Sequence, residues 1–279
     1  MKIEEAITLF GYHQRSNQKT RTIQSYRPLL RKIQGQFAGR SFDSIGPDEI
    51  YHFLEAITEG QAKSTRRLRF AQFKTFCNFL IEKADLNMRN PCDAPILAKA
   101  FKAPRQMARR ILERETVEEL IYNAENLRDR LILELQARCG LRIGESLKIT
   151  VKDVSDRKLI LQEPKSGKES EVAFMPEQIA KRLHDYIQQE NLSPEDRLFP
   201  ICYSTARAAI RRIGKRLNVS LTPHDLRRYS ATHASRNGIP LEIVSKVILR
   251  HQDLKTTQAY LGKISDMEAI RWMDILHGR

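Results

Sequence analysis

The 279-residue sequence lacks several features that mark common protein classes. No apolar run approaches the ~20 residues that a helix needs to cross a bilayer, and the chain opens on an amphipathic helix rather than on a signal peptide. Cysteines are few, widely spaced and without a C-x-x-C pair: Cys77, Cys92, Cys139 and Cys202. We therefore expect a cytoplasmic protein with reduced, mostly buried thiols, no membrane partner and no zinc site.

Acidic residues are also scarce relative to basic ones. The chain holds 48 lysines and arginines against 34 aspartates and glutamates, a formal net charge of +14 and a pI near 9.8. There is no acidic cluster with the character of metal ligands, no internal repeat and no low-complexity tract. Hydrophobic residues make up 41% of the chain, enough for a substantial core. The charge predicts a polyanionic partner, and nucleic acid is the first candidate.

The first hundred residues predict a helical domain. Apolar residues recur at helical spacing over residues 2–10, 20–34, 47–57 and 62–83, and Pro28 predicts a bend or boundary inside the second of these helices. The first 105 residues hold 18 lysines and arginines against 10 acidic residues, and the remainder hold 30 against 24. The more basic segment is the better candidate for gripping phosphates, and we select these side chains at the start of the fourth helix: Lys63, Thr65, Arg66, Arg67 and Arg69. Each could equally lie on a solvated helix face.

The second part of the chain predicts a mixture of helices and strands. Residues 158–162 and 171–175 have strand character, and the turn between them carries Lys165. Residues 204–217 form a basic amphipathic helix whose Arg207 and Arg211 suit contact with a DNA backbone. Three prolines in a polar, basic stretch predict a linker at 89–108. The fold class is therefore mainly α with a small antiparallel β-sheet (α+β).

The stretch from Thr222 to Gly262 predicts three consecutive short helices. His224 and Arg227 share a face of the first helix, His251 ends the second, and Tyr260 lies on the third. These groups could form a phosphate site with a nucleophile, or they could be ordinary polar residues. Arg142, which follows a helix-ending glycine, is either one half of a buried ion pair with Glu145 or an anion ligand.

Taken in chain order, these residues resemble the tyrosine recombinases, the phage integrase family that includes the Xer recombinases. The resemblance rests on G-L-R-x-x-E around Arg142, a lysine in a hairpin, H-x-L-R ending at Arg227, and H then Y nine residues apart in HQDLKTTQAY. It covers essentially the whole chain. It implies a helical, SAM-like core-binding domain over 1–88, a linker over 89–108, and a catalytic domain over 109–279.

The resemblance implies a site-specific recombinase that cuts and rejoins DNA through a 3′-phosphotyrosyl intermediate. The catalytic residues would be Arg142, Lys165, His224, Arg227, His251 and Tyr260. The residue types suit this chemistry: two guanidiniums offset charge on the phosphate, and the phenol attacks it. The histidines and the lysine handle protons and hydrogen bonds. Neither metal, ATP nor another cofactor is expected. Partners would be double-stranded DNA carrying recombination sites, bound in the nucleoid, and other copies of this chain, assembled as a tetramer through a C-terminal exchange helix at about 265–277.

Two departures from the family pattern stand out. Arg250 replaces the glycine that commonly precedes the second histidine, and Arg228 stands where many relatives carry a histidine. Two other functions use the same residues: a DNA-binding regulator without catalysis, and a nicking and rejoining topoisomerase of type IB. The sequence does not distinguish integration, excision and dimer resolution, nor does it identify the target site or the residues that read bases.

Overall fold

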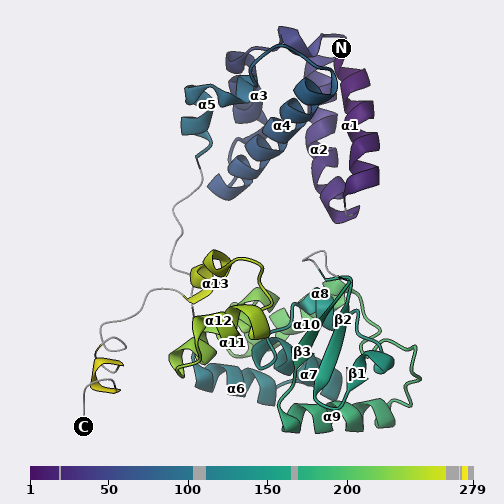
Figure 1. Cartoon of the computed structure of the whole chain (residues 1–279), viewed down its shortest axis with the longest axis vertical. Coiled ribbons are helices and arrows are strands. Elements are labelled where there is room, and N and C mark those ends of the chain that lie inside the picture. The colour runs from purple at the N-terminus through teal and green to yellow at the C-terminus, as the bar shows by residue number, and fades with distance from the viewer. Residues whose placement is uncertain (19, 103–110, 165–168, 262–269, 271, 276–279) are drawn as a thin grey trace. The chain divides into compact units, whose positions relative to one another are not determined.

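The computed structural model in Figure 1 describes the chain except residues 19, 103–110, 165–168, 262–269, 271 and 276–279. For residues 259 and 260 it describes the backbone alone. The chain forms two compact units, Met1–Met107 and Ala108–Arg279, each with its own hydrophobic core.

Helices build the described part of the first unit. They are α1 (Ile3–Asn17), α2 (Thr20–Phe37), η1 (Phe42–Ser44), α3 (Pro47–Thr58), α4 (Lys63–Lys83), η2 (Pro91–Asp93) and α5 (Pro95–Ala100). The core is rich in phenylalanine because helices α1 to α4 each turn aromatic side chains inward. Phe10 and Phe76, for example, meet edge to face with ring centroids 5.2 Å apart, a favoured arrangement for aromatic pairs. This core fixes α4, whose first turns carry the basic residues selected from the sequence.

Two expectations for this unit need correction. Residues 91–100, which their prolines predict to be part of a linker, form η2 and α5, and Leu97 and Phe101 are buried in the first core. The prolines occupy first positions of these short helices, where the absence of an N–H has little cost. Of the bend or boundary expected at Pro28, the boundary is wrong: helix α2 continues through this residue, and Leu29, at 1% exposure, is buried directly after it.

The second unit combines helices with a small sheet, as expected. Its elements are α6 (Arg114–Tyr122), α7 (Leu127–Ala137), α8 (Ile143–Ser146), η3 (Val151–Asp153), β1 (Val154–Ser155), β2 (Lys158–Gln162), β3 (Ser170–Phe174), α9 (Glu177–Gln189), α10 (Tyr203–Arg216), α11 (Pro223–Arg236), α12 (Leu241–Ile243), η4 (Val244–Ile248) and α13 (Leu254–Leu261). The sheet is antiparallel in the order β1-β2-β3, with Leu159 opposite Ala173. In Figure 1 the sheet lies at one side of this unit and α12 and α13 lie at the other.

Helix α7 lies at the centre of the second core. Its residues from Leu131 to Ala137 are all buried, and α6, α9, α10 and α11 contact it. One of these residues is charged: Glu134 is fully buried and pairs with Arg182 of α9, and its carboxylate lies 3.8 Å from Arg130. Removing a partner from a buried charge is strongly unfavourable, so this ion pair holds α9 against α7.

The segment after α11, where the sequence predicts a short helix that ends at His251, is not a regular α-helix. The short helix α12 continues into η4, a π-helical turn in which the Leu249 N–H donates to the Val244 carbonyl at 2.9 Å. Val244 is buried, whereas Ile243 and Val247 are exposed. The wider turn brings the chain after it, Leu249 to His251, into the protein interior. Such π-turns recur at functional sites.

Two glycines of the second unit provide a matched test of this packing. A Cβ at Gly214 in α10 would lie 2.5 Å from the Val219 carbonyl oxygen, whereas a Cβ at Gly144 in α8 would have no neighbour within 4 Å. We expect Gly214→Ala to lower the free energy of unfolding by about 1–3 kcal/mol, as overpacking does. We expect Gly144→Ala to raise it by about 0.4–1 kcal/mol. Urea unfolding followed by circular dichroism measures both, and equal shifts would contradict the packing described here.

Candidate active site

Among the catalytic candidates whose side chains the structure describes, Arg227 of α11 is the most deeply buried. It is 1% exposed, and its guanidinium donates hydrogen bonds to the carbonyl of Gly140 and to the carbonyl of Leu249. These carbonyls come from the turn after α7 and from the turn after η4. One side chain therefore joins three segments that are far apart in sequence.

Gly140 is required where it stands. Its φ is +63°, and a Cβ there would lie 2.7 Å from the Ile248 carbonyl oxygen and 2.9 Å from the Ile248 Cγ2 atom. Both the backbone conformation and the close approach exclude a larger residue. The tight turn presents the Gly140 carbonyl to Arg227, and it places Arg142 at the start of α8.

Arg142 forms the ion pair that the sequence offered as one of two alternatives. Its Nη1 atom lies 2.5 Å from Glu145 Oε1, and its backbone N–H donates to Glu145 Oε2 at 2.8 Å. The side chain of Arg142 nevertheless remains 25% exposed, whereas that of Glu145 is 10% exposed. The pairing thus leaves part of the guanidinium accessible to an anion, and the two alternatives are compatible.

Positive charge exceeds negative charge around Glu145. Arg142, Arg227 and Arg250 surround the carboxylate of Glu145, at 2.5, 3.9 and 3.1 Å. Burial alone would raise the pKa of Glu145, but Arg250, Arg142 and Arg227 together hold this pKa below its ordinary value. The carboxylate is ionised and still outnumbered, which is the electrostatic condition for binding a phosphate.

His224 lies at the exposed start of α11, one turn before Arg227. Thr222 and Asp225 fix this end of the helix, since the Asp225 carboxylate accepts from both the N–H and the hydroxyl of Thr222, at 2.9 and 2.6 Å. Partial loss of hydration, with Arg227 and Arg228 nearby, lowers the pKa of His224. The imidazole is therefore neutral at neutral pH and can accept a proton.

His251 is buried at 7% exposure and contacts α13. Its Nδ1 atom lies 2.9 Å from the Thr257 hydroxyl. Burial, followed by the charges of Arg227 and Arg142, lowers the pKa of His251 to about 4. When the threonine hydroxyl donates to Nδ1, the neutral ring carries its proton on Nε2 and can donate it to an oxygen of a bound anion.

Two of the six catalytic candidates lie wholly or partly outside the part of the chain that the structure describes. Lys165 lies among residues 165–168, outside the described part of the chain, and for Tyr260 the backbone alone is described. That backbone belongs to α13, which packs on α11. Tyr260 follows Thr257 by three residues, so it lies about one helical turn from the residue that contacts His251.

The residues selected for DNA contact have different environments. Lys63, Arg207 and Arg211 are exposed. Arg66 pairs with Glu55, and Arg69 donates to the Ser25 carbonyl at 3.0 Å, while Thr65 and Arg67 are half-buried. Exposed cations suit phosphate contact directly, whereas Arg66 and Arg69 also hold α4 against α3 and α2.

Three residues of this region were not selected from the sequence. In the sequence, Glu145 is only a possible ion partner of Arg142, and Arg250 is only a departure from a family pattern. Thr257 carries no signal of a role. The spacing of Arg142 and Glu145 signals their pairing on one helical turn, but the contacts of Arg250 and Thr257 depend on tertiary structure. Arg228, the other departure, is buried and pairs with Asp225 at 2.8 Å.

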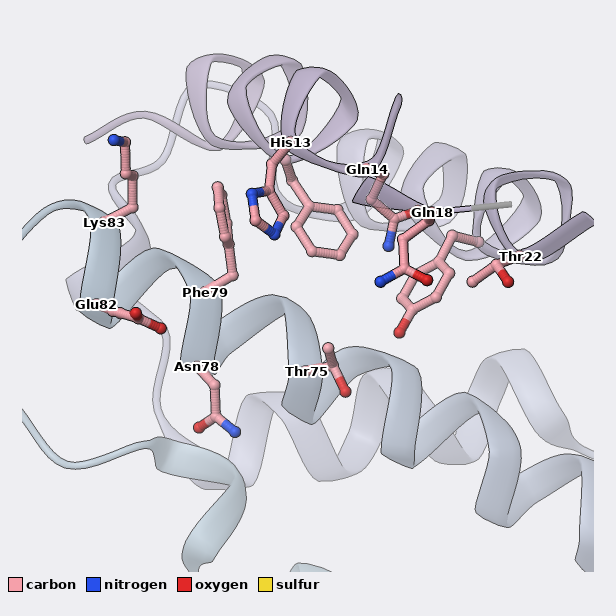
Figure 2. Close-up of a pocket in the computed structure, with 11 residues that line it drawn as sticks. His13, Gln14, Gln18, Thr22, Thr75, Asn78, Phe79, Glu82 and Lys83 are labelled. Carbon is pink, nitrogen blue, oxygen red and sulfur yellow. The ribbon is translucent and has the colours of Figure 1, made fainter. Parts of the chain in front are cut away.

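The first unit has a separate hollow between α1, α2 and α4, with a volume of about 680 Å³. Figure 2 shows polar side chains around it, among them Gln14, Gln18 and Thr75. His13 at its edge packs against Phe79 with ring centroids 4.7 Å apart. This contact accounts for His13 as a packing residue, and the hollow brings together none of the residues selected as catalytic.

In the described part of the chain, no three histidine, cysteine, aspartate or glutamate side chains gather as a metal site would require. No helix in that part combines the length and the apolar character needed to cross a membrane.

The depressed pKa of His251 makes a prediction about acid stability. In the unfolded chain this ring titrates near 6.5, and in the folded unit near 4. As pH falls from 6.5 to 4 the unfolded chain takes up the proton first, so the second unit loses up to about 3 kcal/mol of stability from this group. Histidine NMR titration measures the folded pKa, and unfolding of His251→Gln provides the control with a smaller pH slope. A His251 pKa near 6.5 in the folded protein would contradict the buried geometry.

Comparison with known proteins supplies the family. Residues 110–265 match the phage integrase family, and residues 9–84 match its N-terminal SAM-like domain. The tyrosine recombinase XerA of Saccharolobus solfataricus is 31% identical over 157 residues, which span 56% of this chain and 53% of that protein, about half of each. A tyrosine recombinase of Thermosipho africanus is 28% identical over 287 residues, 96% of each chain.

Solved structures agree on the fold. The Tn1549 transposon integrase in complex with transposon right end DNA superposes with a TM-score of 0.76 at 17% identity, over 99% of both chains. The family match covers more than half of this sequence and includes the segments that carry Arg142, Arg227 and His251. The chain belongs to the phage integrase family.

Proposed function

We propose that this protein is a site-specific DNA recombinase that cuts and rejoins DNA through Tyr260. One observation carries the proposal: Arg142 at the start of α8, His224 and Arg227 of α11, and His251 after η4 come from three segments, which the hydrogen bonds of Arg227 to the Gly140 and Leu249 carbonyls hold together. The tyrosine recombinases among the relatives, and the DNA-bound integrases among the similar folds, support it.

The proposed reaction is a transesterification. The Tyr260 phenol attacks the scissile phosphate, forms a bond to the 3′ phosphate and displaces the 5′ oxygen of the next nucleotide. Arg142 and Arg227 offset the charge that develops on the nonbridging oxygens. His224, which is neutral, takes the phenolic proton, and His251 donates a hydrogen bond to a phosphate oxygen. Lys165 protonates the leaving 5′ oxygen.

We propose that this chemistry needs neither ATP nor a metal ion. The phosphotyrosyl bond conserves the energy of the phosphodiester, so a free 5′ hydroxyl can attack it and restore the DNA backbone. The charge that a metal would supply in other phosphoryl-transfer enzymes comes here from the guanidinium groups around the Glu145 carboxylate.

The domain roles follow the same proposal. We assign the first unit, which extends past residue 88 through η2 and α5, as the core-binding domain, and its basic residues, which include Lys63, grip DNA. Exposed Arg207 and Arg211 of α10 add contacts from the catalytic domain at 109–279. Site-specific action requires several copies on DNA. We propose a tetramer joined by the C-terminal helix at about 265–277, acting on double-stranded DNA in the cytoplasm and nucleoid.

Related structures support this picture for their own proteins. One holds a lambda integrase dimer bound to a COC′ core site, and another holds the XerH recombinase on palindromic difH substrate after cleavage. A regulator without catalysis and a topoisomerase of type IB are the competing assignments, and both predict different products from those of a recombinase.

A suicide-substrate assay tests the nucleophile. Duplexes nicked near candidate sites, incubated with protein and EDTA but without ATP, should give a covalent protein–DNA band on a denaturing gel. Tyr260→Phe should abolish this band while leaving the dissociation constant for DNA within about threefold, because one hydroxyl at the cleavage point contributes little to binding. A band that persists in Tyr260→Phe would contradict the assignment, and binding without a band in the wild type would favour the regulator.

The role of Lys165 has its own test. Lys165→Ala should slow cleavage of ordinary DNA by about 10²–10⁴-fold, the usual contribution of a general acid. A substrate with sulfur in place of the bridging 5′ oxygen needs no proton on its leaving group, so it should restore most of the lost rate. An equal loss on both substrates would show that Lys165 acts in another step.

A further inference from the structure

Arg250 occupies a position that is unfavourable for an arginine. Its φ is +52°, in the left-handed region that glycine adopts without strain, and the residue is only 7% exposed. Both the strained backbone and the buried charge are unfavourable, so the hydrogen bonds and ion pairs of the side chain must compensate for them.

The guanidinium of Arg250 bonds to its own turn and to two groups of the segment Gly140–Glu145. It donates to the Ile248 carbonyl at 2.8 Å, within its own turn, and to the Gly140 carbonyl at 3.1 Å. It also donates to Glu145 Oε2 at 3.1 Å. The Gly140 carbonyl is the same one that Arg227 uses, so Arg250 adds a second bond to the junction on which the site is built.

The bond to Glu145 changes what this carboxylate does to its neighbours. Glu145 Oε1 binds the Arg142 guanidinium at 2.5 Å, while Oε2 receives the Arg142 N–H and Arg250. Arg227 lies farther from Oε2, at 3.9 Å. Arg250 therefore fixes the carboxylate that orients Arg142, and it partly balances a negative charge that would otherwise compete with the phosphate for Arg142 and Arg227.

Arg250 also contacts the sheet. Its Nε atom lies 3.9 Å from a carboxylate oxygen of Glu171, near the start of β3, and the side chains of both residues are at least nine-tenths buried. Strand β3 pairs with β2, and Lys165 lies in the sequence between these two strands. The ion pair thus ties the start of β3 to the arginine cluster.

We propose that Arg250 is a positioning residue for DNA strand cleavage, acting through Glu145 on the orientation and charge of Arg142. It touches no reacting atom. This inference rests on the proposed cleavage activity, and it assigns to this chain an element of the site that glycine cannot provide.

A double-mutant cycle on single-turnover cleavage tests the proposal. Arg250→Gly, which relieves the backbone strain, should slow formation of the covalent complex by about 10–100-fold, with the dissociation constant for DNA within about threefold. Glu145→Gln should also slow it. When Glu145 is already replaced by glutamine, Arg250→Gly should slow formation of the covalent complex by less than about a further threefold, because Arg250 can then no longer act on Arg142 through the Glu145 carboxylate. Arg250→Gly should also raise the His251 pKa, since Arg250 is one of the charges that lower it.

Asp156→Gly is the matched control, because Asp156 also has a positive φ, +49°, but is exposed in the β1–β2 turn. It should leave the cleavage rate unchanged. Arg250→Lys retains the charge but loses the planar guanidinium with its several N–H donors, so its cleavage rate should lie between those of the wild type and Arg250→Gly. If Arg250→Gly does not fold, Arg250→Lys takes its place in the same cycle.

Three results would overturn the proposal. The Arg250 variants could cleave at the wild-type rate, or the loss of cleavage rate in Arg250→Gly could multiply fully with the loss in Glu145→Gln. The third result is a variant whose loss of activity comes entirely from weaker DNA binding. A wild-type protein that forms no covalent complex would instead refute the proposed function itself. The two failures are therefore distinguishable.

Discussion

The second unit depends on the burial of one guanidinium. Arg227 is almost inaccessible to water, and a buried charge is tolerated only when hydrogen bonds and opposite charge compensate it. The carbonyls of Gly140 and Leu249 supply the hydrogen bonds, and Glu145 supplies the opposite charge at 3.9 Å. To bring these groups together the chain needs a glycine with positive φ at 140 and a π-helical turn ahead of Leu249. The arginine thus explains local features that would otherwise seem unrelated.

The same cluster of arginines sets the protonation states around it. Arg227 contributes to the lowered pKa of both His224 and His251, after the effect of burial. Positive charge that favours a phosphate therefore also keeps both imidazoles neutral at neutral pH. A neutral His224 can accept a proton, and a neutral His251 can donate one in a hydrogen bond. Anion binding and proton handling in this site have a common electrostatic origin.

Much of this arrangement could be predicted from the sequence, because it depends on local signals. The span of α4, the bounds of β2 and the cap of Thr222 and Asp225 follow from periodicity and capping. The failures concern signals that tertiary structure overrides. The prolines at 91 and 95 begin short helices packed on the first core, Pro28 lies within a helix held by buried neighbours, and no local pattern signals the π-turn. The contact of Thr257 with His251 joins two helices and cannot be read from spacing.

The most direct test of the account is to identify the residue that becomes covalently attached to DNA. Protein trapped on a suicide substrate would be digested with protease and nuclease, and the modified peptide would be sequenced by mass spectrometry. The account predicts a nucleotide joined through its 3′ phosphate to Tyr260, on the helix that meets His251 through Thr257. Attachment at another tyrosine, or through a 5′ phosphate, would contradict the proposed geometry of the arginines and histidines around the scissile phosphate.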